Sequence, residues 1–325
     1  MRPTNRLLDI PLTATEAFAF EFSAMASPCE IRLSGILQAD AERLANEAIA
    51  EVRRIESKYS RYRSDSLLSQ INAAAGRRDA AIEADAETAQ LLNFAANLST
   101  MSDGLFDCTS GVLRHAWDFR SSRLPSQKNL DTLLPLVGWQ HVAWDGKRVA
   151  LTRTGMELDF GGFGKEYAVD RAATRLEERG VKHGLVNLGG DVRAIGPQRN
   201  GAAWRIGIRD PRAPATEPQR SFASLPLIHG AIATSGDYER FIEVDDKRYC
   251  HILNPKTGWP VSHWRSVSVV GTVSVLAGAL STIAMLKGAD AVDFLDSEGV
   301  GYLLNAANGL IQHRGSDPFY PSAFS

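Results

Sequence analysis

The chain has 325 residues, of which 44% are hydrophobic and 23% are charged, a balance typical of a folded globular protein. Its 36 basic and 38 acidic residues leave a formal net charge of -2, which argues against nucleic acid as a partner. Three cysteines are too few for a disulfide framework, and no segment approaches the roughly 20 apolar residues of a membrane span. Because the first residues lack the apolar stretch of a secretory signal, we expect a cytoplasmic protein without a membrane anchor.

The first half of the chain predicts a tail over residues 1–20, followed by one folded unit over residues 21–325. Apolar residues at helical spacing predict two helices, and one alternating segment predicts a strand. These elements are a strand at Glu30–Ser34, a helix capped by Asp40 that reaches Tyr59, and a helix from about Asp85 that stops before Gly104. Residues 125–146 have a mixed pattern and predict several short elements.

The second half is rich in glycine and in short apolar runs bounded by turns, which predicts strands. The extended segments that we expect are Leu151–Asp159, Leu185–Leu188, Trp204–Arg209, Ala231–Thr234, Phe241–Val244, Arg248–Leu253, Ser266–Val270 and a hairpin of Tyr302–Leu304 with Leu310–His313. The expected helices are Lys165–Arg179, closed by Gly180, and Ser274–Leu286. Strands joined mostly by turns, with helices between them, predict an α+β fold around a largely antiparallel sheet.

Several familiar catalytic patterns are missing from the sequence. There is no His-Glu-x-x-His, no close Cys/His cluster and no Gly-x-Ser-x-Gly, which argues against a zinc hydrolase and a serine hydrolase. The glycine-rich segment Asp159–Lys165 lacks the spacing of a Walker loop. Its glycines would let the backbone approach a ligand, and a helix start that carries Lys165 suits a phosphate. A plain strand-to-helix turn explains these glycines equally well.

Three further polar clusters lie at predicted turns: Asn187–Asp191, Ala233–Glu239 and the segment 248–258. The first is by itself more typical of a plain glycine turn than of a site. The last places His251 inside a predicted strand, where a lone histidine is more often structural than functional. His251 becomes a candidate only together with its neighbours.

Taken in order, six blocks of residues resemble the ApbE family, the FAD:protein FMN transferases. The blocks are Ala24–Pro28, Ser60–Ser66 ahead of Ile71-Asn72, Ser102–Asp107 with Thr109 and Gly111, Asp159–Asp170, the run from Asn187 to Gly258, and Ser266–Val269 leading to Ala279–Thr282. Any single block is a weak signal, whereas six in order over most of the chain are specific. The resemblance implies a T-fold-like α+β unit that holds FAD in a groove between the sheet and loops.

The resemblance also implies an activity: such proteins cleave FAD with Mg²⁺ and attach FMN through its phosphate to a Thr or Ser hydroxyl of a target flavoprotein. The implied FAD contacts are Met25, Tyr62, Leu105, Phe106, Asp107, Gly162, Lys165, Ala168 and Ile252. Asp107 would accept hydrogen bonds from the adenine or ribose. His251 would be the general base for the acceptor hydroxyl, which fits an imidazole pKa of about 6.5, and Asp237 is a lesser candidate for orienting that chemistry.

The implied magnesium site departs from the family pattern. The family's metal block reads Ala-Asp-Ala-Leu-x-Thr, with the aspartate and the threonine as ligands, whereas residues 277–282 read Ala-Gly-Ala-Leu-Ser-Thr. Gly278 therefore stands at the aspartate position. The expected ligands that remain are the hydroxyls of Ser281 and Thr282 and a backbone carbonyl at Gly164.

Two interpretations of Gly278 stay open. Either another carboxylate, such as Asp237 or Asp191, reaches the site, with Lys165 supplying part of the positive charge, or the chain binds FAD and turns it over poorly. The first favours an FMN transferase, the second an FAD-binding protein with little or no transferase activity. A third hypothesis is an FAD pyrophosphatase that gives FMN and AMP.

Overall fold

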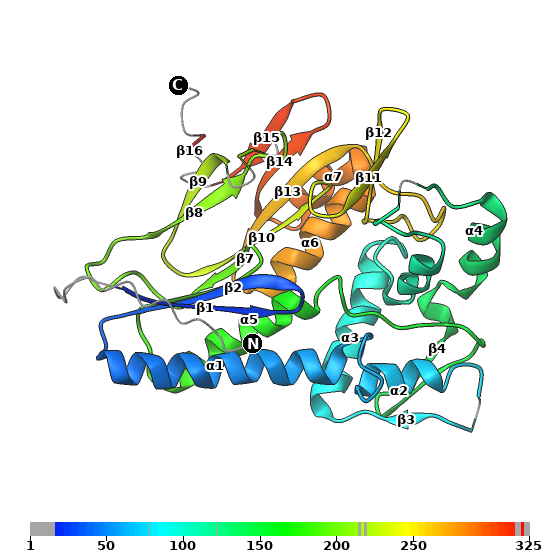
Figure 1. The fold of residues 1–325 in the computed structure, drawn as a ribbon, viewed down its shortest axis with the longest axis horizontal. Coiled ribbons are helices and arrows are strands. Elements are labelled where there is room, and N and C mark those ends of the chain that lie inside the picture. Colours follow the sequence, from blue (N-terminus) through cyan, green and yellow to red (C-terminus); the bar gives the residue numbers. More distant parts are fainter. Residues whose placement is uncertain are drawn as a thin grey trace.

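The computed structural model describes residues 17–315 except 78, 122, 214–215 and 218–219, together with the backbone of residues 320–321. Its main feature is an eight-stranded sheet in which every neighbouring pair that is described runs antiparallel (Figure 1). In spatial order its strands are β1 (Ala17–Ala24), β2 (Ser27–Ser34), β6 (Gly184–Leu188), β7 (Asp191–Ala194), β10 (Gly230–Gly236), β13 (Trp264–Gly271), β14 (Gly301–Ala306) and β15 (Ile311–Arg314). The predicted α+β class with an antiparallel sheet is confirmed.

Smaller sheets flank the main one. They are β8 (Trp204–Arg209) with β9 (Ser221–Leu227) and β16 (Tyr320–Pro321); β3 (Ile82–Glu83) with β4 (Val142–Trp144) and β5 (Arg148–Leu151); and β11 (Phe241–Val244) with β12 (Lys247–Cys250). The α-helices are α1 (Gln38–Tyr59), α2 (Leu67–Ala73), α3 (Ala86–Met101), α4 (Gln127–Leu133), α5 (Gly164–Glu178), α6 (Ser274–Lys287) and α7 (Ala291–Ser297). Short 3-10 helices are η1 (Cys108–His115), η2 (Leu134–Leu136), η3 (Trp139–His141) and η4 (Gly288–Asp290).

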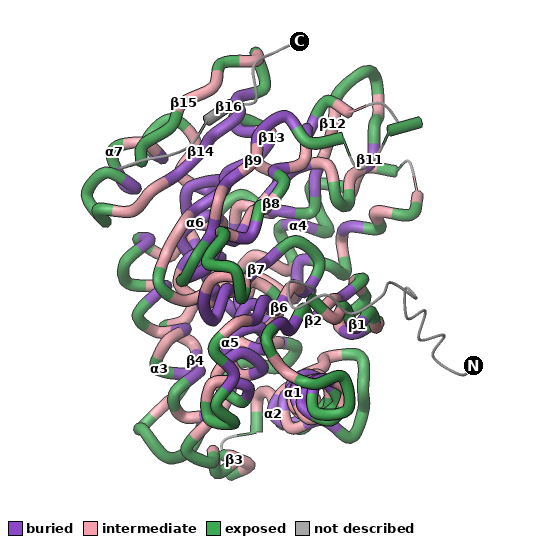
Figure 2. Tube along the Cα trace, turned by 90° about the vertical axis from the view of Figure 1, so that its left-hand side faces the viewer, coloured by how far each residue is buried: buried purple, intermediate pink, exposed green. Residues whose placement is uncertain are grey.

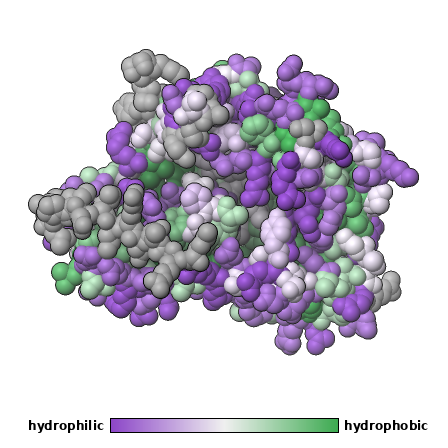
Figure 3. All heavy atoms as spheres, viewed as in Figure 1, coloured by the Kyte–Doolittle hydropathy of each residue, from purple (hydrophilic) through white to green (hydrophobic). Residues whose placement is uncertain are grey.

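Three helices form layers against the main sheet. Helix α6 packs on β10 and β13, α5 packs on α6 and on β6 and β7, and α1 lies on the outer side of α5. Since α5 is enclosed by α1, α6 and the sheet, its buried positions include three alanines, Ala168, Ala172 and Ala173. Figure 2 shows buried residues concentrated along α5, α6 and the strands beside them. In Figure 3, hydrophilic side chains cover most of the visible face.

The helices confirm most of the predicted periodicity and the predicted start of α3, but not the predicted cap of α1. The Asp85 side chain accepts a hydrogen bond from the Thr88 N–H at 2.9 Å and begins α3, as expected. The prediction for Asp40 was wrong, because α1 begins earlier, with Leu37 as its uncapped N-cap residue. Asp40 lies in the first turn instead, where its carboxylate pairs with Arg43 and faces the positive end of the helix dipole.

Two strand predictions need correction. Strand β5 ends at Leu151, so residues 152–159 of the segment predicted as extended form no strand. The Asn72 side chain takes the place of a strand partner, accepting from the Leu158 N–H at 2.7 Å and donating to the Leu158 carbonyl at 2.9 Å. Strand β12 likewise ends at Cys250 rather than Leu253.

Strand β1, which begins at Ala17, lies partly in the segment predicted as a tail, and residues 1–16 are outside the described part of the chain. Residues 274–297 have the length and mean apolarity of a membrane-spanning helix. They comprise α6, η4 and α7, and the apolar side chains of α6 belong to the core between α5 and the sheet. A core helix that is buried on most sides needs the same apolar composition.

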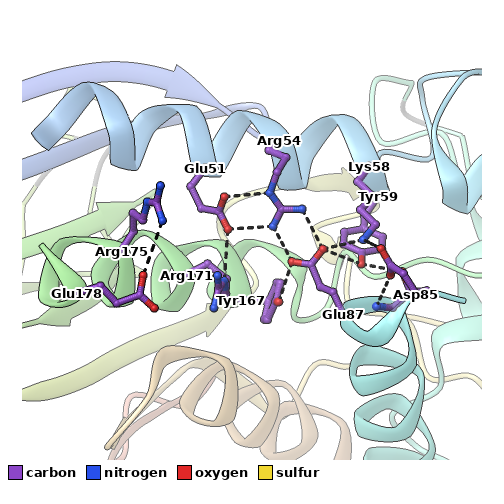
Figure 4. Close-up of polar contacts among 11 residues, drawn as sticks. Glu51, Arg54, Lys58, Tyr59, Asp85, Glu87, Tyr167, Arg171, Arg175 and Glu178 are labelled. Atoms are coloured by element: carbon purple, nitrogen blue, oxygen red, sulfur yellow. Dashed lines mark hydrogen bonds and ion pairs between the residues drawn. The ribbon is translucent and has the colours of Figure 1, made fainter. Parts of the chain in front are cut away.

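The Glu87 carboxylate of α3 joins α3 to α1 and α5 (Figure 4). It accepts hydrogen bonds from Arg54 at 2.6 Å, Lys58 at 2.7 Å and the Tyr167 hydroxyl at 2.9 Å. These donors, led by Arg54, hold the pKa of Glu87 well below its ordinary value of 4.5 despite partial burial. The network thereby anchors the first turn of α5, which reaches the candidate site described below.

The Asp170 carboxylate of α5 caps α6. One oxygen accepts from the Ser274 N–H at 2.9 Å and the other from the Val275 N–H at 2.8 Å, while Arg193 of β7 pairs with the same carboxylate at 3.2 Å. The N-cap residue of α6, Val273, makes no side-chain cap of its own. A carboxylate 104 residues away in sequence therefore satisfies the first N–H groups of a buried helix.

We expect Glu87→Gln to lower the free energy of unfolding by about 1–2 kcal/mol at pH 7, because three donors lose an anionic acceptor. Since the folded-state pKa of Glu87 lies below 4.5, this stabilisation is present above that value and declines as the pH falls below it. Urea unfolding at pH 7 and pH 3 measures both effects. Glu178→Gln, which removes an exposed carboxylate of α5 that lies 3.8 Å from Arg175, is the matched control. Equal stabilities of the two variants at pH 7 would contradict the role of Glu87.

For Asp170→Ala we expect a larger loss of about 2–4 kcal/mol, because two buried N–H groups of α6 lose their acceptor. Arg193 keeps a second partner, Glu177, at 3.1 Å. The control is Asp40→Ala in the first turn of α1, where the carboxylate is exposed and the expected loss is below about 0.5 kcal/mol. Chemical denaturation of both variants tests the difference, and an Asp170 variant as stable as the control would refute the capping role.

Candidate functional site

A large cleft opens where several loops converge beside the ends of α1, α5, α6 and the central strands. Its lining includes most of the predicted site residues: Met25, Tyr62, Leu105, Phe106, Asp107, Gly162, Gly164, Lys165, His251, Ile252 and Thr282. Three other predicted residues, Ala168, Asp237 and Ser281, are buried and do not line it. The tertiary structure thus brings together groups that come from both halves of the chain.

The glycine-rich loop before α5 forms one wall of the cleft. The Asp159 carboxylate pairs with Arg61 and accepts from the Gly161 N–H at 2.9 Å, which fixes the start of the loop. A Cβ atom on Gly162 would lie 2.8 Å from the Phe106 ring, so the backbone can approach that ring only because residue 162 has no side chain. The loop ends at Phe163, the N-cap residue of α5, which makes no side-chain cap. Uncapped N–H groups at a helix start are suited to an anionic ligand.

Lys165 adds a full positive charge to this helix start. Its Nζ lies 2.8 Å from a carboxylate oxygen of Asp191, which is 2% exposed at the β6–β7 turn. Burial by itself lowers the pKa of Lys165, but the Asp191 carboxylate outweighs burial and raises the pKa above its ordinary value. Lys165 is therefore a cation throughout the physiological pH range.

Glu166 follows directly and turns toward α6, where Gly278 lies. A Cβ atom on Gly278 would be 2.6 Å from the Glu166 Cγ and 2.8 Å from its Oε1, so the Glu166 side chain occupies the space of a residue-278 side chain. Glu166 is 8% exposed, and its Oε2 has no hydrogen-bond partner among the described residues. Burial, together with the nearby Asp191 carboxylate, raises the pKa of Glu166 well above its ordinary range.

Three hydroxyl groups cluster at the middle of α6. The Ser235 Oγ of β10 lies 2.8 Å from the Ser281 Oγ and 2.9 Å from the Thr282 Oγ1. The Ser281 hydroxyl also donates to the Gly278 carbonyl at 2.9 Å. Of these groups, Thr282 and Ser235 line the cleft. The predicted ligand Thr282 thus faces the cleft, whereas Ser281 lies behind it and orients its neighbours.

His251 lies just beyond the end of β12, not inside a strand as the sequence predicts. Its Nδ1 lies 3.2 Å from the Arg240 carbonyl, which assigns the proton to Nδ1 and leaves Nε2 with a free lone pair. The ring keeps an accessible edge in the cleft, yet the surrounding protein and the charges of Arg240 and Lys165 lower the pKa of His251 to about 4. A neutral imidazole with a free Nε2 can accept a proton at neutral pH.

Asp237, predicted to orient the chemistry, faces away from the cleft. Its carboxylate lies 2.7 Å from Arg265 and 3.5 Å from Arg248, and the side chain is 5% exposed. Because Arg248 belongs to β12, this ion pair holds the strand that leads to His251. A direct role of Asp237 in the chemistry stays an untested prediction.

Tyr62 and Met25 are two of the residues predicted to contact FAD, and both line the cleft. Tyr62, which is 75% exposed, presents its ring below the Arg61 guanidinium at 5.0 Å, and Met25 lies in the two-residue turn between β1 and β2 with a φ of 50°. The Met25 N–H donates to Glu56 at 2.6 Å, which anchors this turn to α1. An exposed aromatic ring and a partly buried thioether at a cleft are suited to stacking on planar rings.

Asp107 has partners within the protein. Its carboxylate accepts from the Thr109 N–H at 2.8 Å, from the Thr109 hydroxyl at 2.6 Å and from the Trp139 N–H at 2.7 Å. It caps η1 and ties it to η3. The predicted contact of Asp107 with adenine or ribose is untested, as is that of Ala168, which is packed inside the core.

Two features of the site have little or no signal in the sequence. The pair of Arg61 and Asp159 spans 98 residues, so no local pattern reveals it although both residues lie in matched blocks. Glu166 has only a weak signal: an acidic residue beside Lys165, together with a glycine where the family block has an aspartate. Only the packing of α5 on α6 connects these two observations.

Known proteins resemble this chain over most of its length. The model of the ApbE family matches residues 25–304. An FAD:protein FMN transferase of Klebsiella pneumoniae is 30% identical over 284 residues, covering 86% of this chain and 85% of the relative. The crystal structure of an ApbE protein from Thermotoga maritima has a TM-score of 0.83 at 30% identity, covering 93% of this chain and 98% of that one. The apo form of the flavinyl transferase ApbE from Pseudomonas stutzeri has a TM-score of 0.80 at 30% identity, with 94% and 96% covered.

The family match extends over both walls of the cleft, from the turn that carries Met25 to strand β14. The similarity in fold covers nearly the whole chain. The chain therefore belongs to the ApbE family and is an enzyme of the class to which these relatives belong.

Proposed function

We propose that this chain transfers FMN from FAD to a Thr or Ser hydroxyl of an acceptor flavoprotein and releases AMP. The observation that carries the proposal is the arrangement of Lys165 and a neutral His251 in one cleft, near enough that the Lys165 charge lowers the pKa of His251. Lys165 suits the diphosphate of FAD, and the His251 Nε2 suits the proton of an acceptor hydroxyl.

In the proposed reaction the acceptor hydroxyl oxygen attacks the phosphorus of the FMN half of FAD. A new P–O bond to the acceptor forms as the P–O bond to the AMP phosphate breaks. The hydroxyl proton moves to the Nε2 of His251, while Nδ1 keeps its hydrogen bond to the Arg240 carbonyl. Lys165 and the N–H groups at the start of α5 would oppose the negative charge on the diphosphate oxygens.

We also propose a magnesium dependence. Mg²⁺ prefers a few protein oxygens and completes its shell with water and substrate phosphates. The cleft offers that donor chemistry, because the Thr282 and Ser235 hydroxyls line it. Glu166 also lines it, and the buried Oε2 of its carboxylate has no hydrogen-bond partner among the described residues. No cluster of three or more His, Cys, Asp or Glu side chains that could hold a metal occurs in the described part of the chain. When bound, the cation would supply charge neutralisation at the diphosphate.

For His251→Asn we expect a 10²- to 10⁴-fold lower rate of transfer, because the acceptor hydroxyl loses its base, with FAD affinity little changed. Mass spectrometry of a co-expressed acceptor protein measures transfer, and flavin fluorescence measures FAD binding. His313→Asn in β15, where the side chain is exposed, is the matched control.

Transfer by His251→Asn at the wild-type rate would disprove the assignment of the base. AMP release by the wild type without modification of the acceptor would identify a pyrophosphatase instead. Binding of FAD without AMP release would identify a flavin-binding protein.

The low pKa of His251, about 4, predicts an unusual pH dependence. Because the neutral imidazole is the active form, the transfer rate should stay independent of His251 titration from pH 8 down to about pH 5 and fall as the pH approaches 4. Proton NMR of the imidazole resonance, assigned by its loss in His251→Asn, gives the pKa directly. A resonance that titrates near pH 6.5 would contradict the prediction.

A further inference from the structure

Glu166 and Gly278 face each other where α5 meets α6. We propose that Glu166 is the carboxylate that binds the divalent cation in this chain, replacing from α5 the aspartate that the family block carries on α6. The proposal deepens the proposed function and rests on it. According to this proposal, the aspartate that is missing at residue 278 and the new ligand Glu166 belong to the same metal site. Their side chains would need the same space.

The first observation is steric. A Cβ atom on Gly278 would lie 2.6 Å from the Glu166 Cγ, 2.9 Å from its Cδ and 2.8 Å from its Oε1. Real Cβ atoms essentially never approach other heavy atoms this closely, so Glu166 in this position requires glycine at residue 278. The carboxylate of Glu166 therefore stands where an aspartate at residue 278 would place its side chain.

The second observation is an unused oxygen. The Glu166 Oε2 is buried and accepts no hydrogen bond from the described residues, although buried carboxylate oxygens are normally paired. Glu166 is also among the residues that line the cleft. A buried, unpaired oxygen on a side chain that lines a cleft has the character of a ligand atom whose cation is supplied from outside the chain.

The third observation concerns neighbours. Residues 278 and 282 are one helical turn apart on α6 and lie on the same face, so Glu166 at Gly278 is beside the Thr282 hydroxyl that lines the cleft. The Ser235 hydroxyl, 2.9 Å from Thr282, adds a further oxygen. One carboxylate with two hydroxyls leaves positions for phosphate and water, as Mg²⁺ requires.

The two carboxylates that the sequence suggested for this role have other partners. Asp191 pairs with Lys165 at 2.8 Å and accepts from the Thr234 N–H at 3.2 Å. Asp237 pairs with Arg265 and Arg248 and does not line the cleft. Of these three carboxylates, Glu166 is the one that forms no ion pair with a described residue, and its Oε2 accepts no hydrogen bond from them.

The direct test is Mn²⁺ binding to the purified, FAD-loaded protein, followed by the loss of the free Mn²⁺ signal in electron paramagnetic resonance. Mn²⁺ shares the preference of Mg²⁺ for oxygen ligands. We expect Glu166→Gln, which keeps the shape and removes the charge, to raise the dissociation constant at least about tenfold. Glu178→Gln, at an exposed position near the end of α5, should bind Mn²⁺ as the wild type does.

A swap of the ligand between helices is the sharper test. Gly278→Asp alone should not tighten Mn²⁺ binding and should lower the melting temperature, because the new side chain meets Glu166. In the Glu166→Ala background, Gly278→Asp should restore Mn²⁺ binding to within about threefold of the wild type. Glu166→Ala with Gly278→Asn has the same shape without the charge and should remain weak.

Wild-type Mn²⁺ affinity in Glu166→Gln would overturn the proposal, as would tighter binding in Gly278→Asp alone. FAD fluorescence in the presence of EDTA separates this failure from that of the proposed function. A wild-type protein that binds FAD but no Mn²⁺ would refute the role of Glu166 and the proposed magnesium dependence, whereas one that binds no FAD would also refute the proposed transfer of FMN.

Discussion

The position of α5 against α6 depends on one buried carboxylate, that of Asp170. It satisfies the first N–H groups of α6 from a neighbouring helix, and Arg193 of β7 holds it in place. Because these partners come from both helices and the sheet, the two helices cannot slide along each other without leaving buried N–H groups unpaired. The crossing of α5 and α6 brings Glu166 to Gly278, and the packing of α5 on β7 brings Lys165 to Asp191.

Two groups in the cleft, Lys165 and His251, each have one predominant protonation state at neutral pH. Lys165 is held cationic by Asp191, whereas His251 is held neutral by its surroundings and by nearby positive charge. A cation for a diphosphate and a free imidazole nitrogen for a hydroxyl are the two groups that phosphoryl transfer to a protein acceptor needs. The Tyr62 ring and the Met25 thioether also line the cleft, which is thereby suited to a flavin nucleotide.

Glycine at residue 278, where the family has an aspartate, leads to one interpretation from the sequence alone and to another from the folded structure. Compared block by block, the chain lacks an acidic residue, which favours a flavin-binding protein without catalysis. In the folded protein a carboxylate occupies the vacated volume, brought there by a different helix. The ligands of a metal ion are defined by their positions around the ion and can come from several elements. A motif along one helix contains only the ligands that this helix contributes.

The sequence by itself determined the secondary structure that has a local cause, and the family. Periodic apolar residues predicted α1 and α3, with the start of α3 near Asp85, and the glycines that flank Lys165–Arg179 predicted α5. Six ordered motifs identified the family and brought His251, Lys165 and Thr282 into one hypothesis, and all three residues line the cleft.

Only the tertiary structure decided the contacts whose partners are far apart in the chain. The extended segment after β5 pairs with the Asn72 side chain instead of a strand, Asp107 and Asp237 use their carboxylates within the protein, and Glu166 fills the place of residue 278. Helical and strand periodicity report which face of an element is buried, but not which side chain of another element it meets. That pairing depends on how the helices cross and on where glycine leaves room, which is settled only when the chain is folded.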